Sequence, residues 1–407
     1  MEEWKEYKIG DITKTNTSQY SLSEGWETIQ YLDTGSITKN QISGIEKFFG
    51  NIDLPSRARR KVKHGDIVYS CVRPNLCHYG YIDNPPANLL VSTGFAVITV
   101  DPNLADARYI YYYLTQNHIV QSLHTIGEQA VSTYPSIKAS DIEDLSISLP
   151  SLPIQHKIAS ILKSLDDKIE VNRKINENLE QQAQALFKSW FVDFEPFKNG
   201  EFVESELGMI PKGWRVGTLE EIGDIVGGST PSKSKPEYYT DKGIAWLTPK
   251  DLSISNNKFT SKGEIDITEE GYKSCSTKLM PKGSVLFSSR APIGYITIAK
   301  NDICTNQGFK SVVPKLAGTA FIYYFLKIST KDIENKATGS TFKEASGALM
   351  KSLQLIIAPE QILQGFENAM TPLFKKQEIL EDESRRLAEL RDTLLPKLMS
   401  GELHINN

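Results

Sequence analysis

The sequence lacks the features that mark membrane, secreted and metal-binding proteins. It contains no run of about 18 or more apolar residues, which a transmembrane helix requires, and its first residues carry no apolar stretch of the kind found in signal peptides. The four cysteines, Cys71, Cys77, Cys275 and Cys304, form no CxxC pair, and no histidine stands at zinc-finger spacing, so no metal site is expected. Few, scattered cysteines are typical of a protein of the reducing cytoplasm.

Motifs of DNA-modifying enzymes are also missing. Asn84, Pro85 and Pro86 resemble the start of the loop with which adenine methyltransferases hold a flipped base, but Ala87 stands where that loop has a stacking aromatic residue. No glycine-rich loop for a methyl donor or for ATP is present, and no paired acidic site for a nuclease can be picked out. We therefore expect a proline-rich turn at 84–86 and no catalytic residue in this chain. The net charge of −4 argues against a simple, strongly basic nucleic-acid binder, although not against a DNA reader whose partner supplies much of the phosphate contact.

Two long helices are predicted at matching places, in residues 153–192 and 359–400. In each stretch one seam residue recurs every seven positions, which is typical of a coiled coil, and the two seams of the chain can satisfy each other. Pro372 is expected to kink or break the second helix. Asn172 is a polar seam residue with no obvious partner, and it either fixes the register or is solvated at the edge. The seam consists of Ile158, Leu165, Asn172, Leu179 and Leu186 in the first stretch, and Phe366, Leu373, Leu380, Leu387 and Leu394 in the second.

The regions before the two helices repeat one another. Residues 65–70 are echoed by 283–288, and the aromatic block 110–114 by 322–326. Runs of β-branched and aromatic residues predict strands at 67–69 and 96–100, and we expect helices near 106–118 and 319–328. This is an α+β pattern, repeated in two halves whose intervening segments differ freely. It fits two copies of one fold that meet different targets, although an old duplication without functional meaning gives the same pattern.

Three segments around the first long helix, 152–158, 165–169 and 186–191, resemble the central conserved region of type I restriction-modification specificity subunits. In the second half, 227–232, 289–294 and 306–309 resemble the target-recognition domains of that family. The resemblance implies two similar mixed α/β target-recognition domains, separated by two long helices that pack as an antiparallel coiled coil. The implied domains are 1–152 and 214–358, with the central helix at 153–194, a connector at 195–213 and the C-terminal helix at 359–403.

The resemblance also implies a function, which is that of a non-catalytic DNA-reading subunit in the cytoplasm. Its expected partners are double-stranded DNA, two methyltransferase subunits and, in a complete system, restriction subunits. No cofactor is expected in this chain; S-adenosylmethionine, ATP and magnesium would belong to the partner subunits. Each domain would read one half of a bipartite, asymmetric site. The alternative is a coiled-coil scaffold or interaction protein that organises partners without reading DNA.

The sequence offers three groups of candidate DNA contacts. A basic cluster can neutralise phosphates or read guanine, but a solvated charged loop is an equally good interpretation. A polar loop beside two glycines can approach a backbone closely or be a plain turn. An arginine follows a strand in each half, and the one in the second half, Arg290, can face DNA or bind its own loop's carbonyls. The aromatic block Tyr111–Tyr113 favours a helix core over a base-stacking platform. The candidates are Arg57, Arg59, Arg60, Lys61, Lys63 and Arg73 in the first half, and Ser229, Thr230, Lys233, Lys235 and Arg290 in the second.

Overall fold

The computed structural model describes residues 4–129, 134–254, 257–339 and 343–403. The chain forms two compact units, each of which contains parts of both long helices. Unit 1 comprises Met1–Lys168 and Arg386–Asn407, and unit 2 comprises Ile169–Arg385. Within the described ranges no helix is long and apolar enough to cross a membrane.

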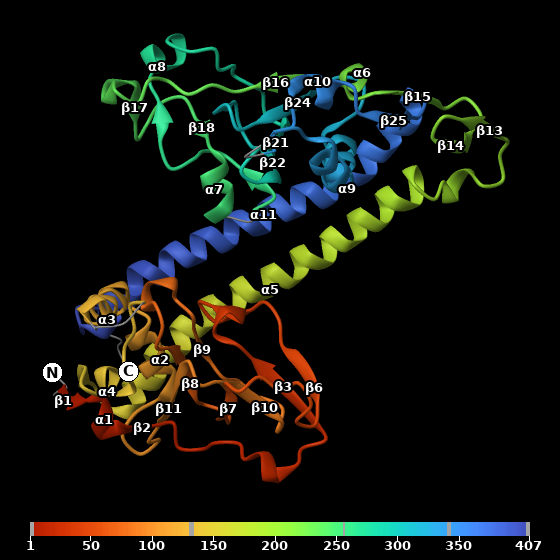
Figure 1. Ribbon diagram of the computed structural model, residues 1–407. Helices are drawn as coiled ribbons and strands as arrows, with labels where there is room; N and C mark the ends of the chain where they lie inside the picture. The colour runs from red at the N-terminus through yellow and green to blue at the C-terminus, as the bar shows by residue number, and fades with distance from the viewer. Residues whose placement is uncertain (1–3, 130–133, 255–256, 340–342, 404–407) are drawn as a thin grey trace. The chain divides into compact units, whose positions relative to one another are not determined.

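The described residues of unit 1 form two four-stranded sheets and two strand pairs (Figure 1). The first sheet has the order β2-β11-β8-β9, with strands Thr13–Thr15, Phe95–Val100, Ile67–Ser70 and Tyr79–Tyr81. The second has the order β6-β3-β10-β7, with strands Glu46–Phe49, Thr28–Leu32, Leu89–Ser92 and Ala58–Lys61. The pairs are β1 (Lys5–Lys8) with β12 (Ser146–Leu149), and β4 (Ile37–Thr38) with β5 (Gln41–Ile42). The strands predicted at 67–69 and 96–100 are therefore confirmed.

The helices of unit 1 pack beside the first sheet. They are α1 (Ile9–Ile12), α2 (Ala107–Leu114), α3 (Asn117–Gln129) and α4 (Ala139–Glu143). The single helix expected near 106–118 is wrong, since α2 ends at Leu114 and a separate helix begins at Asn117. Tyr111 and Tyr112 are buried in the core of unit 1, which confirms the helix-core interpretation of the aromatic block.

Unit 2 is built around a five-stranded sheet of order β16-β24-β21-β22-β19. Its strands are Gly223–Gly227, Lys310–Pro314, Val285–Ser289, Ile293–Ala299 and Phe259–Thr260. The strand pairs are β13 (Phe202–Ser205) with β14 (Gly208–Pro211), β15 (Arg215–Thr218) with β25 (Gln354–Ile357), β17 (Tyr239–Thr240) with β20 (Asp266–Ile267), and β18 (Trp246–Leu247) with β23 (Cys304–Thr305). The short helices are α6 (Leu219–Ile222), α7 (Pro249–Ile254), α8 (Glu269–Lys273) and α10 (Gly347–Lys351). Helix α9 (Thr319–Lys336) packs on β21 and β22 (Figure 1), and it extends beyond the stretch expected at 319–328.

The two units share one strand order. The run β2-β11-β8-β9 in unit 1 matches β16-β24-β21-β22 in unit 2, and the pair β1-β12 matches β15-β25. The fifth strand, β19, extends the sheet of unit 2 beyond this shared frame. The repeat predicted from the sequence is therefore a repeat of topology.

The long helices are α5 (Leu152–Phe191) and α11 (Glu360–Met399), of 40 residues each. Helix α11 continues through Pro372, so the predicted break is wrong. A proline removes one hydrogen bond to the carbonyl four residues earlier. Because Pro372 and Asn368 are both exposed, that carbonyl can be solvated, while Met370 and Phe374 pack the rest of this turn into the core.

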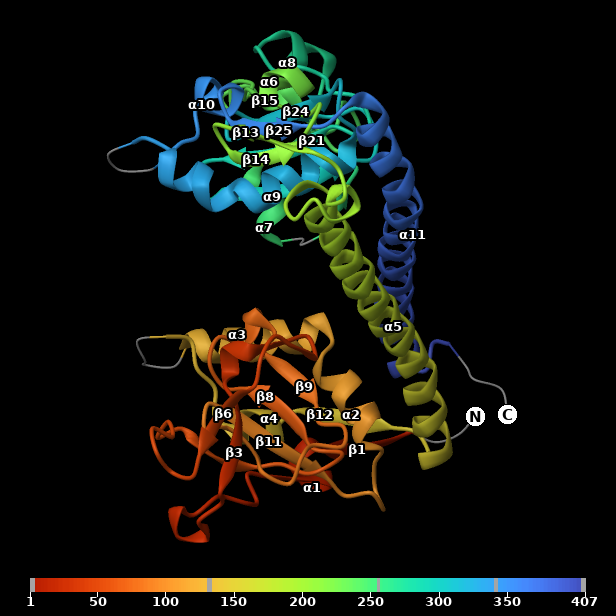
Figure 2. The ribbon, with the colours of Figure 1, turned by 90° about the vertical axis from the view of Figure 1, so that its right-hand side faces the viewer.

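Within unit 2, α5 and α11 lie side by side and antiparallel (Figure 1 and Figure 2). Asn172 contacts Glu383 and Ser384, whereas Phe187, further along α5, contacts Phe366 earlier in α11. In unit 1, Asp166 pairs with Arg391 in the same sense, at 2.6 Å. The predicted antiparallel coiled coil is therefore confirmed.

Burial along the predicted seam is uneven. Ile158, Asn172, Phe366 and Leu380 are buried, and the other predicted seam positions are partly buried. Additional buried residues, including Leu162, Ala183 and Met370, share the interior with them. Asn172 is fully buried and donates hydrogen bonds from Nδ2 to Glu383 Oε2 at 2.9 Å and to Ser384 Oγ at 3.3 Å. Glu383 and Ser384 are thus the partners that the sequence did not make obvious, and the interpretation of Asn172 as a solvated edge residue is wrong.

Candidate nucleic-acid interface

The polar loop after β16 lies on another loop of its own domain. A Cβ atom added at Gly228 would lie 2.1 Å from the carbonyl oxygen of Asn306, so only glycine permits this approach. Beside it, the Ser229 amide donates to the carbonyl of Thr305 at 3.0 Å, and the Thr230 hydroxyl donates to Gln307. The close backbone contact expected from the glycines is thus made within the protein.

This packing leaves a polar surface made by two loops. Gln307 is exposed and meets Thr230 from the loop that follows β23. Lys233 and Lys235 are exposed on the same loop as Thr230, and Lys235 Nζ lies 3.0 Å from the hydroxyl of Tyr238. Gln307 belongs to the motif at 306–309 but is not among the predicted contacts, because its partner Thr230 is 77 residues away in the sequence.

Arg290 follows β21 and faces a distant loop of unit 2. Its Nη1 lies 3.5 Å from Glu344 Oε2, and Lys310 Nζ lies 3.2 Å from Glu344 Oε1. A backbone bridge also joins Arg290 to Glu344. Among the described residues the side-chain partner of Arg290 is this carboxylate, and the suggested contact with its own loop's carbonyls is not found. Two cations thus converge on one acid at a partly exposed position.

Arg73 lies in the loop of unit 1 that matches the loop of Arg290, one position further along. The Cys71 amide donates to the carbonyl of Gly94 as the Ser289 amide donates to that of Gly308, so Arg73 corresponds in position to Ala291. Its amide donates to the carbonyl of Pro135 at 2.9 Å, and its exposed guanidinium lies 4.6 Å from the ring centroid of Tyr134. Arg73 has a φ of +47°, and Ala291, in the matching loop, has a φ of +50°. Non-glycine residues rarely adopt this conformation, and it is concentrated at functional sites. The two units therefore present an arginine from the same kind of loop, beside different partners.

The basic cluster of unit 1 is a strand rather than the solvated loop considered as its alternative. Arg59, Arg60 and Lys61 belong to β7, an edge strand, in which successive side chains point to opposite faces. Arg60 is partly buried, donates to Asn16 and has its pKa lowered by burial.

The remaining members of the cluster differ in exposure. Lys61 pairs with Glu24 and lies 5.2 Å above the ring of Trp26, while Arg59 Nη1 donates to its neighbour's carbonyl at 2.9 Å. Arg57 and Lys63 are exposed at the two ends of the strand. Neighbouring cations of the cluster therefore differ: Arg60 and Lys61 are paired within the protein, whereas Arg57 and Lys63 are exposed to solvent.

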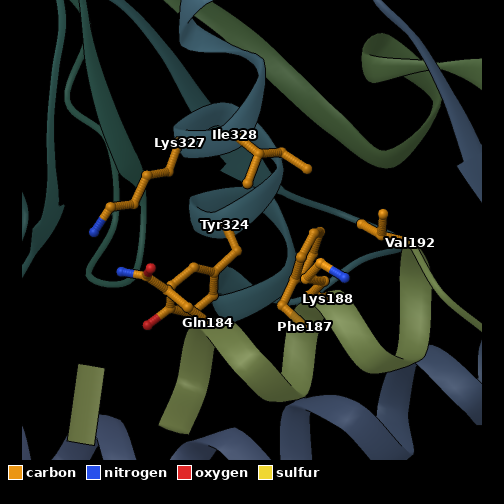
Figure 3. A pocket seen from close by; sticks show the side chains of 7 residues that line it. All are labelled: Gln184, Phe187, Lys188, Val192, Tyr324, Lys327 and Ile328. Carbon is orange, nitrogen blue, oxygen red and sulfur yellow. The ribbon is translucent and has the colours of Figure 1, made fainter. Parts of the chain in front are cut away.

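A separate groove of about 440 Å³ lies in unit 2 between α5 and α9 (Figure 3). Its walls are mainly apolar, and its two lysines are engaged: Lys188 pairs with Asp193, and Lys327 Nζ lies 2.6 Å from Glu180. It is lined by Gln184, Phe187, Lys188 and Val192 of α5, and by Tyr324, Lys327 and Ile328 of α9.

Comparison with known proteins accounts for the repeated architecture. A family model described as the type I restriction modification DNA specificity domain matches residues 1–181 and 211–388. The chain belongs to this family. The match to the specificity family covers both units.

Individual relatives cover the chain to different extents. It is 29% identical to the type I restriction enzyme HindI specificity subunit of Haemophilus influenzae, over 99% of this chain and 100% of that protein. It is 40% identical to the type I restriction enzyme MjaIX specificity subunit of Methanocaldococcus jannaschii, over 44% of each. The crystal structure of a type I restriction-modification S subunit from M. genitalium aligns with a TM-score of 0.61 at 17% identity, over 98% of this chain and 96% of that one. At this identity the structural likeness shows the fold alone.

Proposed function

We propose that this chain is the non-catalytic DNA specificity subunit of a type I restriction-modification complex, and that it reads a bipartite, asymmetric site. The observation that carries the proposal is the repeated frame with matched but chemically different loops. Arg73 stands beside an aromatic ring, whereas Arg290 stands beside a carboxylate. Two copies of one reader with unlike surfaces suit two unlike half-sites. A scaffold that does not read DNA would have no use for this difference.

The proposed domain boundaries follow the internal repeat of the chain. We propose residues 1–152 and 214–358 as the two recognition domains, 153–194 and 359–403 as the helices that serve as spacer and as dock, and 195–213 as the connector. The groove between α5 and α9 has the apolar walls of a protein contact, and a methyltransferase subunit is the proposed occupant. One such subunit for each half would methylate one adenine per half-site, using S-adenosylmethionine that it binds itself. The ATP-driven steps would belong to restriction subunits.

The exposed cations are the proposed DNA contacts. Arg57 and Lys63 flank an edge strand of unit 1, and Lys233 and Lys235 lie on the polar loop of unit 2. Lysine and arginine at such positions bind phosphates, and their binding weakens with salt. Arg73 and Arg290 have the donor geometry for base edges, which arginine reads in the major groove.

A domain exchange tests the proposal. Residues 1–152 are replaced by those of a relative, the chain is assembled with its methyltransferase subunits, and the methylated sites are mapped across a genome. We expect one half-site to change while the other half-site and the gap stay the same. The reciprocal exchange of 214–358 is the matched control and should change only the other half. A map in which both half-sites change together, or a single continuous palindrome, would contradict two independent readers.

A second measurement separates the subunit from an enzyme and from a scaffold. The purified chain alone should methylate no adenine and cut no DNA, while its complex with methyltransferase subunits should bind the mapped site more tightly than a scrambled one. Methylation by the chain alone would refute the non-catalytic role. Equal binding of both DNAs by the complex would favour the scaffold.

A further inference from the structure

Unit 2 contains a lysine in an unusual place. Lys258 lies between α7 and β19 and is 7% exposed. Removing an ammonium group from water is costly unless hydrogen bonds and an opposite charge compensate. Its neighbourhood is therefore expected to supply both.

Three helices supply the compensation. Lys258 Nζ lies 2.8 Å from Glu180 Oε2 on α5, 2.8 Å from the Tyr324 hydroxyl on α9 and 2.9 Å from Gln377 Oε1 on α11. An ammonium group has three donors, and each finds one acceptor here. The ring centroid of Phe374 lies 3.7 Å from the same nitrogen, a distance suited to a cation–π contact.

The backbone of the same segment is also held by α11. Glu381 accepts the amide hydrogens of Lys258 at 2.9 Å and of Phe259 at 3.2 Å. The carbonyl of Lys258 accepts from the Ile298 amide of β22 at 2.8 Å, so the segment belongs to the sheet. One short stretch of the recognition domain is thus attached to both long helices by its side chain and its backbone.

In unit 1 a different set of side chains joins the recognition domain to the long helices. Tyr112, which stands where Tyr324 does in the repeat, donates to Asp166 Oδ2 at 2.7 Å, and Asp166 pairs with Arg391 at 2.6 Å. Both members of that ion pair come from the long helices. In unit 2 the cation comes from the recognition domain, from the segment that leads into β19, the strand without a counterpart in the sheet of unit 1.

We infer that Lys258 is a positioning residue that locks the five-stranded sheet of unit 2 onto the helix pair, and so fixes the register at which the second domain reads its half-site. The inference deepens the proposed function and rests on it. An apolar contact would bind the sheet as firmly but would tolerate sliding. Three directional hydrogen bonds to three helices define one position, the role for which buried polar groups are best attested.

The test uses the complete complex with its methyltransferase subunits and a set of DNAs. These carry the mapped site with its own gap, or with a gap longer or shorter by one base pair. Lys258→Met removes the charge and keeps the length of the side chain. Lys250→Met is the matched control, because Lys250 lies on nearby α7 and pairs with Glu264 at 2.8 Å on the surface.

We expect Lys258→Met to lower the preference for the correct gap by about tenfold, the scale of one lost charge-assisted hydrogen bond. Lys250→Met should leave the preference unchanged, and Lys258→Arg should restore part of it. A folded Lys258→Met complex that keeps the full preference would overturn the inference. A wild-type complex that methylates no bipartite site would instead overturn the proposed function.

A pH series on the wild-type complex keeps the test valid if Lys258→Met does not fold. Burial lowers the pKa of Lys258 to about 8, against the opposing effect of Glu180. The charged and titratable groups that face it are Glu180 on α5, Tyr323, Tyr324 and Lys327 on α9, and Glu381 on α11.

The preference for the correct gap should decline as the pH rises from 7 to 9, because Lys258 loses its proton in that range. The preference is a ratio of two DNAs in one reaction, so the pH response of the methyltransferase cancels. A preference that is constant over this range would contradict the inference.

Discussion

Replacing Asn172 by leucine should stabilise the protein. Asn172 is fully buried between α5 and α11, and only its Nδ2 is satisfied. Its Oδ1 accepts no hydrogen bond from any residue that the structure describes. A buried polar atom without a partner costs about 1–3 kcal/mol. The side chain therefore weakens the seam in which it lies.

The sum of four contributions predicts the sign of the stability change for Asn172→Leu. Leucine forfeits two hydrogen bonds. The bond to the partly exposed Glu383 carboxylate is worth about 1.5 kcal/mol, because its acceptor is charged, and the long bond to Ser384, at 3.3 Å, is worth about 0.5 kcal/mol. It relieves the unpaired oxygen and adds about 1.5–3 kcal/mol of apolar burial, while its larger size costs about 1 kcal/mol in strain. Glu383 is only partly buried, so water can replace its lost partner. The net expectation is a gain of about 1 kcal/mol, or about 2–4 °C in Tm.

Thermal unfolding followed by circular dichroism measures this shift. Leu380→Asn is the control, because Leu380 is 2% exposed and the exchange places an amide at an apolar seam position. That variant should lose about 3 kcal/mol. A fall in the Tm of Asn172→Leu would refute the reasoning, because it would show that the Asn172 contacts stabilise the helix pair rather than define its register at a cost.

Other variants test the coiled-coil seam, the proposed base contact of Arg73 and the buried carboxyl group of Glu381. Leu179→Glu and Leu387→Glu should each lower stability by about 1–3 kcal/mol, and normal unfolding and partner binding of both would contradict the seam assignment. Arg73→Ala should relax one base position in one half-site, at a cost of about 1–3 kcal/mol, whereas an equal loss on all sequences would indicate a phosphate contact. Burial raises the pKa of Glu381 to about 7 from its ordinary value of 4.5, so the folded state holds this proton more tightly, and the contribution of Glu381 to stability should fall as the pH rises between these values. Glu381→Gln should flatten that slope in a series of unfolding measurements, and an unchanged slope would exclude Glu381 as its cause.

The parts of the fold that were predictable from sequence are those set by local pattern. The run from Ile67 to Tyr69 is β-branched and aromatic, and it forms a buried strand. The seven-residue step from Phe366 to Leu394 needs no distant information, and it predicted that the two long helices pair. The repeat of blocks such as 110–114 and 322–326 became a repeat of strand order.

The errors arose where tertiary packing overrides a local rule. Pro372 disfavours a helix locally, yet packing on the opposite side of α11 and an exposed carbonyl make it tolerable. The cluster around Arg60 has the composition of a loop, but pairing with β10 makes it a strand. The break between α2 and α3 at residues 115–116 carries no glycine or proline to mark it.

The partners of polar side chains were the least predictable feature, and they matter most for function. The loops of Arg73 and Arg290 can be matched from sequence, but Tyr134 and Glu344 cannot be assigned as partners of these arginines without the fold. In each case the backbone keeps the arginine in place, through the loop after a matched strand, while a separate loop supplies the partner. A change in that second loop can alter the electrostatics around the arginine without disturbing the sheet beneath. Because the sheet that holds the arginine and the loop that supplies its neighbour are separate, the same fold can come to recognise different half-sites.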